Sequence, residues 1–139
     1  MSLVRDGMLS DPAALDVESS VQEAARHLSR PDVRAVLVVD GAGVLVGVVT
    51  ADSLVSRVVA EGLDPTSTPV TEAVDAPALT LEADLPLDEG YRLLEEAEVE
   101  RAPVLEHGRL VGVLSRSVVQ RRLAEDEPPA EDETDPASE

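Results

Sequence analysis

Apolar and polar residues follow the same order twice along this chain. In each half a short apolar piece, at residues 14–17 and 78–81, precedes a stretch whose apolar residues recur at helical spacing. These residues are Val21, Ala24, Ala25 and Leu28 in the first half, and Leu87, Gly90, Tyr91 and Leu94 in the second. The spacing predicts one helix in each half and places Tyr91 on the side that faces the core.

Two apolar runs follow each of these helices. In the first half they cover residues 35–39 and 44–49, and the sequence DGAG at 40–43 joins them. A turn of this kind predicts a hairpin, and His107-Gly108 predicts a tighter one in the second half. A further helix is expected over residues 51–61 and again from 116 to about 124, so each half is predicted to be β-α-β-β-α.

The two halves align as a tandem duplication. Glu23 falls on Glu89, an offset of 66 residues, and after a shorter second turn Leu45 falls on Leu110, an offset of 65. The phrase GVVTADSL at 47–54 returns as GVLSRSVV at 112–119. Both faces of the strands are expected to be covered, because the strands are apolar at nearly every position. We therefore expect an α/β (α+β) fold in which repeat 1 (residues 1–64) and repeat 2 (residues 65–123) share a core and pack about a pseudo-twofold axis, with clefts at their junction.

The acidic charge of the chain narrows its possible partners. Its 139 residues include 29 Asp and Glu against 11 basic residues, all of them Arg, for a formal net charge of -18. Such a field repels nucleic acid and anionic membranes, so neither is expected as a partner. The segment 124–139, AEDEPPAEDETDPASE, is acidic and rich in Pro, which predicts a disordered tail, either simply solvated or used for docking. There is no Cys and no apolar run of the length of a membrane span or signal peptide, so we expect a cytoplasmic protein.

Residues for catalysis or metal binding are not arranged in any familiar pattern. The two histidines, His27 and His107, lack neighbours at metal-ligand spacing, so no metal site is expected. The chain has no Lys, and it shows neither a nucleophile beside a base nor a glycine-rich phosphate loop. We therefore do not expect an enzyme.

The hairpin and closing phrases of both halves resemble those of a known family, the tandem CBS-domain pair or Bateman module. The phrases are VVDGAGVLVGVVTADSL and RAPVLEHGRLVGVLSRSVV, and VRDGMLSDPAAL and VTEAVDAPAL resemble the segments that lead into the repeats of that family. The resemblance covers about residues 3–123. It implies a stand-alone regulatory module that senses an adenosine-containing ligand, of the AMP, ATP or S-adenosylmethionine type, between its repeats and signals to a separate partner protein. It also implies a homodimer built through the helices of both halves, and no required cofactor.

The resemblance carries candidate contacts for the ribose and phosphate onto four positions. Thr50 and Ser115 match the closing hydroxyl of the family. Three residues further on, where the family has an Asp that contacts the ribose, this chain has Ser53 and Val118. Ser53 offers only neutral hydrogen bonds and Val118 none, so a single surviving site is expected to use Thr50 and Ser53. Thr50 and Ser115 are also expected to cap the helices that follow them.

Further candidates surround the expected base and phosphate positions. Pro103 matches the proline that frames the base in the family, whereas the first half has Leu37 there. Arg101 and Arg116 are candidates for a phosphate, although surface pairing with the many carboxylates is the other interpretation. Weaker candidates of the same kind are Arg34 and Arg57. The acidic body is expected to favour AMP or an uncharged adenosine derivative over a triphosphate, unless local arginines reverse this preference.

Two functions are therefore open from the sequence. The first is the ligand-sensing regulatory module that the resemblance implies. The second is a structural or dimerisation module that is indifferent to nucleotides, since Ser53, Val118 and Leu37 leave neither half with the complete family pattern.

Overall fold

The computed structural model describes residues 1–126. Its elements are α1 (Val4–Gly7), β1 (Leu9–Ser10), β2 (Ala14–Asp16), α2 (Val21–Leu28), β3 (Val36–Val39), β4 (Leu45–Val49), α3 (Ala51–Leu54), the π-helix η1 (Val55–Val59), the 3-10 helix η2 (Val70–Ala73), β5 (Leu81–Glu82), α4 (Leu87–Ala97), β6 (Arg101–Glu106), β7 (Arg109–Ser115) and α5 (Arg116–Asp126). Of the predicted tail, residues 124–126 are the end of α5, and residues 127–139 lie outside the described part of the chain.

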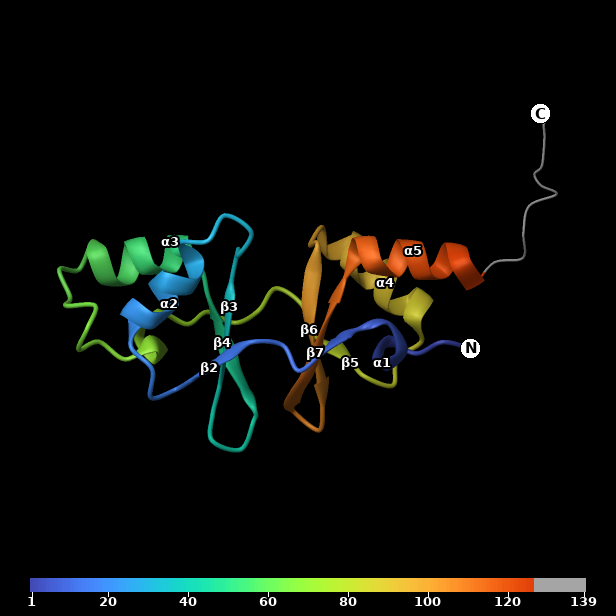
Figure 1. Cartoon of the computed structure of the whole chain (residues 1–139), viewed down its shortest axis with the longest axis horizontal. Helices are drawn as coiled ribbons and strands as arrows, with labels where there is room; N and C mark the ends of the chain where they lie inside the picture. The colour runs from blue at the N-terminus through green and yellow to red at the C-terminus, as the bar shows by residue number, and fades with distance from the viewer. Residues whose placement is uncertain (127–139) are drawn as a thin grey trace, which may run out of the picture.

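The strands form two sheets that lie side by side at the centre of the molecule (Figure 1). The first has the order β2-β3-β4 and the second the order β1-β7-β6-β5. In both, a parallel pair (β2 with β3, β5 with β6) adjoins an antiparallel hairpin (β3 with β4, β6 with β7). Helices α2 and α3 lie on the outer side of the first sheet and α4 and α5 on that of the second (Figure 1). The mixed α/β fold built from two β-α-β-β-α repeats is thus confirmed.

Each repeat is completed by a segment that comes from the other. We call residues 4–15 and 70–79 the lead-in segments. In the first, Val4 belongs to the apolar cluster that contains Leu87 and Leu114 of repeat 2, and β1 pairs antiparallel with β7. In the second, Val70 belongs to the cluster of repeat 1 that contains Val38. The expected shared core is therefore wrong, since the structure has two apolar clusters, each filled by one repeat together with the lead-in segment of the other.

Two equivalent glycines permit this exchange. A Cβ atom on Gly47 would lie 2.6 Å from the carbonyl oxygen of Asp75, where the second lead-in segment crosses β4. A Cβ atom on Gly112 would lie 2.8 Å from the carbonyl oxygen of Leu9, where the first lead-in segment crosses β7. The crossing at Gly47 is fixed by two backbone hydrogen bonds between Val48 and Asp75, at 2.9 and 2.8 Å. Glycine is needed at both positions because the crossing chain occupies the space of a side chain.

The hairpin turns of the two repeats meet in a symmetrical way. The N–H of Leu45 donates to the carbonyl of Gly108 at 3.3 Å, and the N–H of Leu110 donates to the carbonyl of Gly43 at 2.9 Å. The two hydrogen bonds are equivalent, because Leu45 corresponds to Leu110 and Gly43 to Gly108 at the repeat offset of 65 residues. This reciprocal pair fits the expected pseudo-twofold relation between the repeats, and both glycines have the positive φ that their tight turns require.

The structure differs from the sequence-based expectations in three further places. The helix expected over residues 51–61 is α-helical only to Leu54 and continues as the π-helix η1. The short helices α1 and η2 are not predicted, because four residues carry no periodic signal. The expected coverage of both strand faces holds only in part: Ala102, Pro103 and Val104 of β6 are all buried, whereas in β3 Val36 and Val38 are buried and Leu37 and Val39 are half-buried. The apolar character of the second face has another cause, since Leu37 lines the cavity described below.

The helices that follow the hairpins, α3 and α5, are capped by side chains at their starts. The N–H of Ser53 donates to Oγ1 of Thr50 at 3.2 Å, and the N–H of Thr50 donates to Oγ of Ser53 at 2.9 Å. In the second repeat the N–H of Val118 donates to Oγ of Ser115 at 3.3 Å. The predicted capping roles of Thr50 and Ser115 are confirmed. The predicted packing of Tyr91 against the core is confirmed as well, and its hydroxyl accepts a hydrogen bond from Gln120.

We predict that Gly47→Ala destabilises the protein by about 1–3 kcal/mol, because the new methyl group forces the crossing backbone at Asp75 away from β4. The free energy of unfolding, measured by urea denaturation, checks this. The matched control is Gly41→Ala in the hairpin turn, where the added Cβ meets no atom within 4 Å. Equal denaturation midpoints for the two variants would contradict the proposed crowding.

Replacing Thr50 by Ala is expected to cost about 1 kcal/mol of unfolding free energy, because the N–H of Ser53 loses its capping acceptor. Thr71→Ala is the control, since Thr71 is exposed and its hydroxyl has no hydrogen bond within residues 1–126. Thermal unfolding followed by circular dichroism distinguishes the two variants, and an unchanged melting temperature for Thr50→Ala would argue against the cap.

Candidate functional site

A cavity of about 590 Å³ lies at the junction of the two repeats. Its walls come from matching parts of both halves. Pro12 and Ala13 of the first lead-in segment line it together with Pro77 and Ala78 of the second. Because both lead-in segments cross to the opposite repeat, any molecule in this cavity contacts both halves of the protein.

The walls of the cavity are apolar and accessible. Ala13 and Ala78 are both exposed to solvent, and Leu9 exposes 70% of its surface. Leu37 of β3 and Pro103 of β6, which are equivalent positions in the repeats, face the same cavity. A flat apolar group such as a nucleobase suits such walls, since binding sites for small molecules are mostly apolar with a few polar groups that fix orientation.

The lining of the cavity also contains charged residues from both repeats. Its lining includes three arginines and one histidine but a single carboxylate: Arg30, Arg34, Arg101, His27 and Asp32. All three arginines are exposed. The cavity is therefore locally basic in a protein whose formal net charge is -18. A local cluster of guanidinium groups attracts an anion in spite of the overall charge, because screening by salt confines the field of distant carboxylates to about 10 Å.

The structure separates the six candidate ligand residues into two groups. Arg101 and Pro103 lie at the start of β6 and line the cavity. Thr50, Ser53, Ser115 and Arg116 lie at the starts of α3 and α5 and are not part of the cavity lining. The contact of each residue with a ligand remains a prediction.

The Ser53 hydroxyl already has partners within the chain. It donates to the carbonyl of Thr50 at 2.9 Å and accepts from the Thr50 N–H at 2.9 Å, and the Ser53 residue is only 4% exposed. A ribose hydroxyl would have to displace one of these bonds. The described conformation thus uses Thr50 and Ser53 to hold the helix start.

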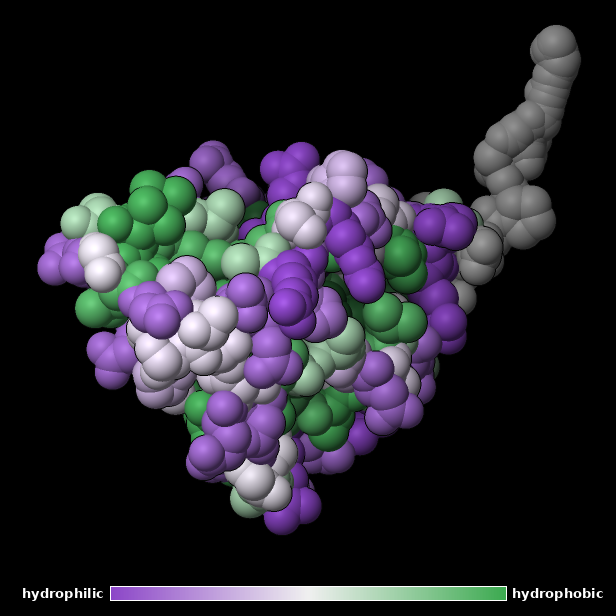
Figure 2. All heavy atoms as spheres, turned by 60° about the vertical axis from the view of Figure 1, so that its left-hand side comes forward, coloured by the Kyte–Doolittle hydropathy of each residue, from purple (hydrophilic) through white to green (hydrophobic). Residues whose placement is uncertain are grey.

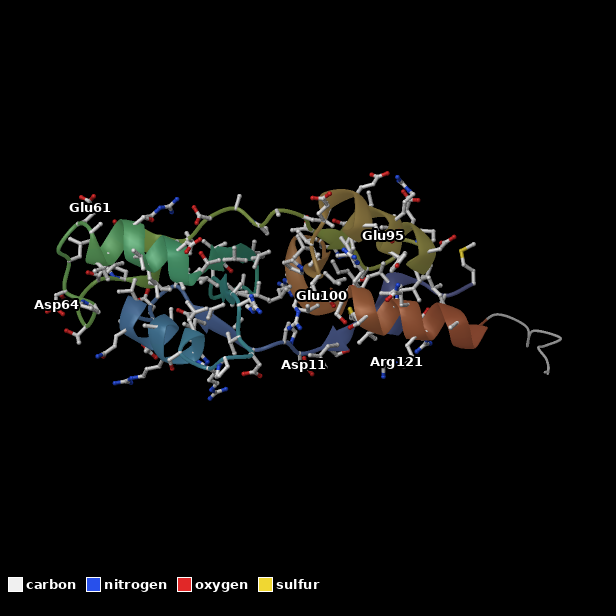
Figure 3. All side chains as sticks on the ribbon, turned by 90° about the horizontal axis from the view of Figure 1, so that it is seen from above. Asp11, Glu61, Asp64, Glu95, Glu100 and Arg121 are labelled. Atoms are coloured by element: carbon white, nitrogen blue, oxygen red, sulfur yellow. The ribbon has the colours of Figure 1, made fainter. Side chains whose placement is uncertain are left out.

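The start of α5 is occupied by a carboxylate. Glu100 accepts the N–H of Ser117 at its side chain, at 3.3 Å, and the N–H of Arg116 at its carbonyl, at 2.7 Å. Figure 3 shows Glu100 beside the beginning of α5, near the middle of the molecule. An anionic side chain is stabilised there by the exposed N–H groups of the first helical turn.

The sequence did not indicate three polar residues of the cavity lining, His27, Arg30 and Asp32, which lie at the end of α2 and in the loop after it. It ranked Arg34 below Arg101, although both line the cavity. The sequence does contain a signal that could have indicated Arg30 and Arg34. The repeat alignment places Arg30 on Glu96 and Arg34 on Glu100, so the charge changes sign at both positions. A change of sign between equivalent positions marks a place where the two repeats have different roles.

The carboxyls whose pKa is shifted lie away from the cavity. The backbone N–H and the hydroxyl of Thr66 lower the pKa of Asp64, and the hydrogen bond from Arg92 lowers the pKa of Glu89. These groups stabilise a turn and a helix. Residues 1–126 contain no group of three side chains that could hold a metal ion. None of the helices in the same range has the length and apolar character needed to cross a bilayer.

Comparison with known proteins agrees with this geometry. The CBS domain-containing protein YhcV of Bacillus subtilis is 30% identical to this chain over 115 residues, which cover 83% of this chain and 81% of YhcV. The crystal structure of CBSX2 in complex with AMP has a TM-score of 0.72 at 24% identity and covers 90% of this chain and 98% of that one. The crystal structure of Hypoxic Response Protein I with two coordinated zinc ions has a TM-score of 0.71 at 24% identity and covers 91% of this chain and 100% of that one. These two structures support the fold.

The family model for the CBS domain matches the chain twice, over residues 4–60 and 65–125. The two matches follow the two repeats that the alignment and the structure define. The chain therefore belongs to the CBS-domain family and contains two CBS domains in tandem.

Proposed function

We propose that this CBS pair is a regulatory module that binds an adenosine-containing ligand in the cavity between its repeats and signals the binding to a partner protein. The observation that carries the proposal is the cavity itself, with apolar walls from both lead-in segments and three arginines in its lining. The AMP complex of the structural neighbour CBSX2 supports an adenine nucleotide as the type of ligand.

The position of the cavity suggests how binding becomes a signal. The walls formed by residues 12–14 and 77–79 lead directly into strands β2 and β5, one in each sheet. A ligand that contacts both walls favours the arrangement of the repeats in which both contacts are made. It shifts the population toward this arrangement by its difference in affinity between the two states. A partner that recognises only one arrangement then responds to the ligand.

Filling the cavity is expected to abolish binding. We predict that Ala78→Trp weakens the binding of AMP more than about tenfold, equivalent to about 1.4 kcal/mol, because the indole occupies the space of the base. Isothermal titration calorimetry with AMP, ADP, ATP and S-adenosylmethionine measures this. Ala25→Trp, on the exposed side of α2 and outside the cavity lining, is the matched control. Absence of heat and of thermal stabilisation with all four ligands at millimolar concentration would refute the proposal.

A second candidate function, a dimerisation module, is favoured by one surface. Val55, Val59 and Leu63 expose 58%, 69% and 41% of their surface on η1 and the turn after it. Figure 2 shows apolar side chains gathered at the upper left, over α3 and η1. The equivalent helix of repeat 2 has Gln120 and Ala124 in place of Val55 and Val59. An apolar patch on one repeat suits a twofold contact with the same patch of a second copy, because such a contact is self-complementary.

Charging this patch is expected to separate the copies. We predict a dimer for the unmodified protein at micromolar concentration and a monomer for Val59→Glu, since burial of each valine contributes at most about 1.5–3 kcal/mol and a buried carboxylate opposes association. Light scattering coupled to size-exclusion chromatography gives the masses. Ala124→Glu, the equivalent position on α5, is the control that leaves the dimer intact. A monomeric unmodified protein would rule out this function.

A further inference from the structure

One arginine side chain ties the second lead-in segment to η1. The guanidinium of Arg57 donates to the carbonyl of Val74 at 2.7 Å and forms a hydrogen-bonded ion pair with the carboxylate of Asp75. A half-exposed ion pair of this kind adds little stability by itself. The planar guanidinium nevertheless fixes geometry, because it binds two consecutive residues of the segment at once. We call Arg57, Val74 and Asp75 the arginine clamp.

The clamped residues are joined directly to the cavity. The N–H and the carbonyl of Asp75 are hydrogen-bonded to Val48 at 2.8 and 2.9 Å, and Val48 is part of the cavity lining. Two residues further along the chain, the same segment forms the cavity wall at residues 77–79. Arg57 is not part of the lining. The arginine clamp therefore connects η1 to the wall without contacting a molecule in the cavity.

The helix that carries Arg57 has a different form in the two repeats. In η1 the N–H of Ala60 donates to the carbonyl of Val55, five residues earlier, at 2.8 Å. The equivalent stretch of α5 is α-helical, so the same place in the fold accepts both forms. Short π-helical turns are rare and often occur at functional sites. Val55 and Val59 are exposed on η1, so a change in this turn alters an apolar part of the surface.

The arginine clamp is found in repeat 1 only, although both repeats have the arginine. With the offset of 65 residues, Arg57 corresponds to Arg122 of α5. Asp75 corresponds to Leu9, since each pairs with the same position of its strand, β4 or β7. Leu9 has no carboxylate, and none of the ion pairs of the described residues joins Arg122 to the first lead-in segment. The duplication thus provides an internal comparison, with one wall held by a side chain and the other by backbone pairing.

We infer that Arg57 is a positioning residue that couples the cavity to η1, so that occupancy of the cavity changes η1 of repeat 1 and leaves α5 of repeat 2 unchanged. The inference rests on the proposed function and specifies the path by which that site signals. A ligand that fixes the wall at residues 77–79 also fixes Asp75 and, through Arg57, stabilises η1. Coupling between two sites is reciprocal, so a partner bound at η1 changes the affinity of the cavity.

The test is hydrogen–deuterium exchange of the full chain, free and saturated with whichever of AMP, ADP, ATP and S-adenosylmethionine binds most tightly in calorimetry. We expect the ligand to slow amide exchange over residues 54–63 at least about fivefold, the lower end of usual coupling between sites, and over residues 116–124 less than about twofold. In Arg57→Gln the effect over residues 54–63 is expected to fall below about twofold. The affinity of this variant stays within about threefold, because Arg57 is outside the cavity lining.

Two further variants control for a purely structural effect. Arg122→Gln removes the equivalent arginine of α5 and is expected to retain the full ligand effect over residues 54–63. Asp75→Asn removes the charge of the acceptor and is expected to reduce the effect in the same direction as Arg57→Gln. Each comparison is made between the free and bound forms of one variant, so a general loss of stability does not produce the expected result.

A substitution in the wall tests the coupling without a ligand. The indole of Ala78→Trp fills the cavity next to the clamped segment, and we expect it to change amide exchange over residues 54–63 at least about fivefold. The same substitution in the Arg57→Gln background is expected to change exchange there less than about twofold, because the connection to η1 is lost.

The outcomes separate this inference from the proposed function. If a ligand binds but exchange over residues 54–63 is unchanged, if Arg57→Gln retains the effect, or if Arg122→Gln loses it, the coupling is refuted while the ligand site stands. If no ligand titrates, yet Ala78→Trp alters exchange over residues 54–63 only when Arg57 is present, the coupling stands and the adenosine ligand is refuted. If no ligand titrates and the effect of Ala78→Trp is absent or survives Arg57→Gln, both are refuted.

Discussion

Close passage of one backbone over another is the constraint on which this structure depends. At Gly47 and Gly112 the lead-in segment of one repeat crosses a strand of the other, so near that a Cβ atom would collide with a carbonyl oxygen. The crossing allows β1 to extend the sheet of repeat 2 and Asp75 to pair with β4 of repeat 1. It also delivers Val4 and Val70 to apolar clusters that their own repeats would leave incomplete. Packing, sheet formation and the relation between repeats thus follow from two positions without a side chain.

The same crossing creates the cavity. Each lead-in segment passes from one repeat to the other. The residues at the passage, among them Pro12 and Pro77, form walls of the cavity. A duplication of this kind produces equivalent walls on both sides of the axis. Charge then distinguishes them, because Arg34 and Glu100 occupy matching positions on the same backbone path. The fold supplies a symmetrical frame, and the two repeats differ in charge at these equivalent surface positions.

Local structure could be predicted from the sequence more fully than the site. The helix α2 and both hairpins follow from apolar spacing and turn residues, which are properties of neighbouring positions. The exchange of lead-in segments could not be predicted, because the partner of a two-residue strand such as β1 is decided by tertiary contacts. The helix-start residues Thr50 and Ser53 were matched to a family phrase, but their hydroxyl groups bond to each other's backbone, whereas Arg30 reaches the cavity only through the position of the end of α2.

The exchange of lead-in segments has a consequence for cooperativity. The two apolar clusters are separate, yet each contains residues that belong, along the chain, to the opposite repeat. When repeat 1 unfolds, it withdraws strand β1 and Val4 from repeat 2, and when repeat 2 unfolds, it withdraws Val70 from repeat 1, so each cluster is expected to lose stability with the other repeat. Two cores of this size would unfold in two steps if they were merely tethered. Because each cluster contains a segment of the opposite repeat, the two repeats are expected to unfold as one cooperative unit.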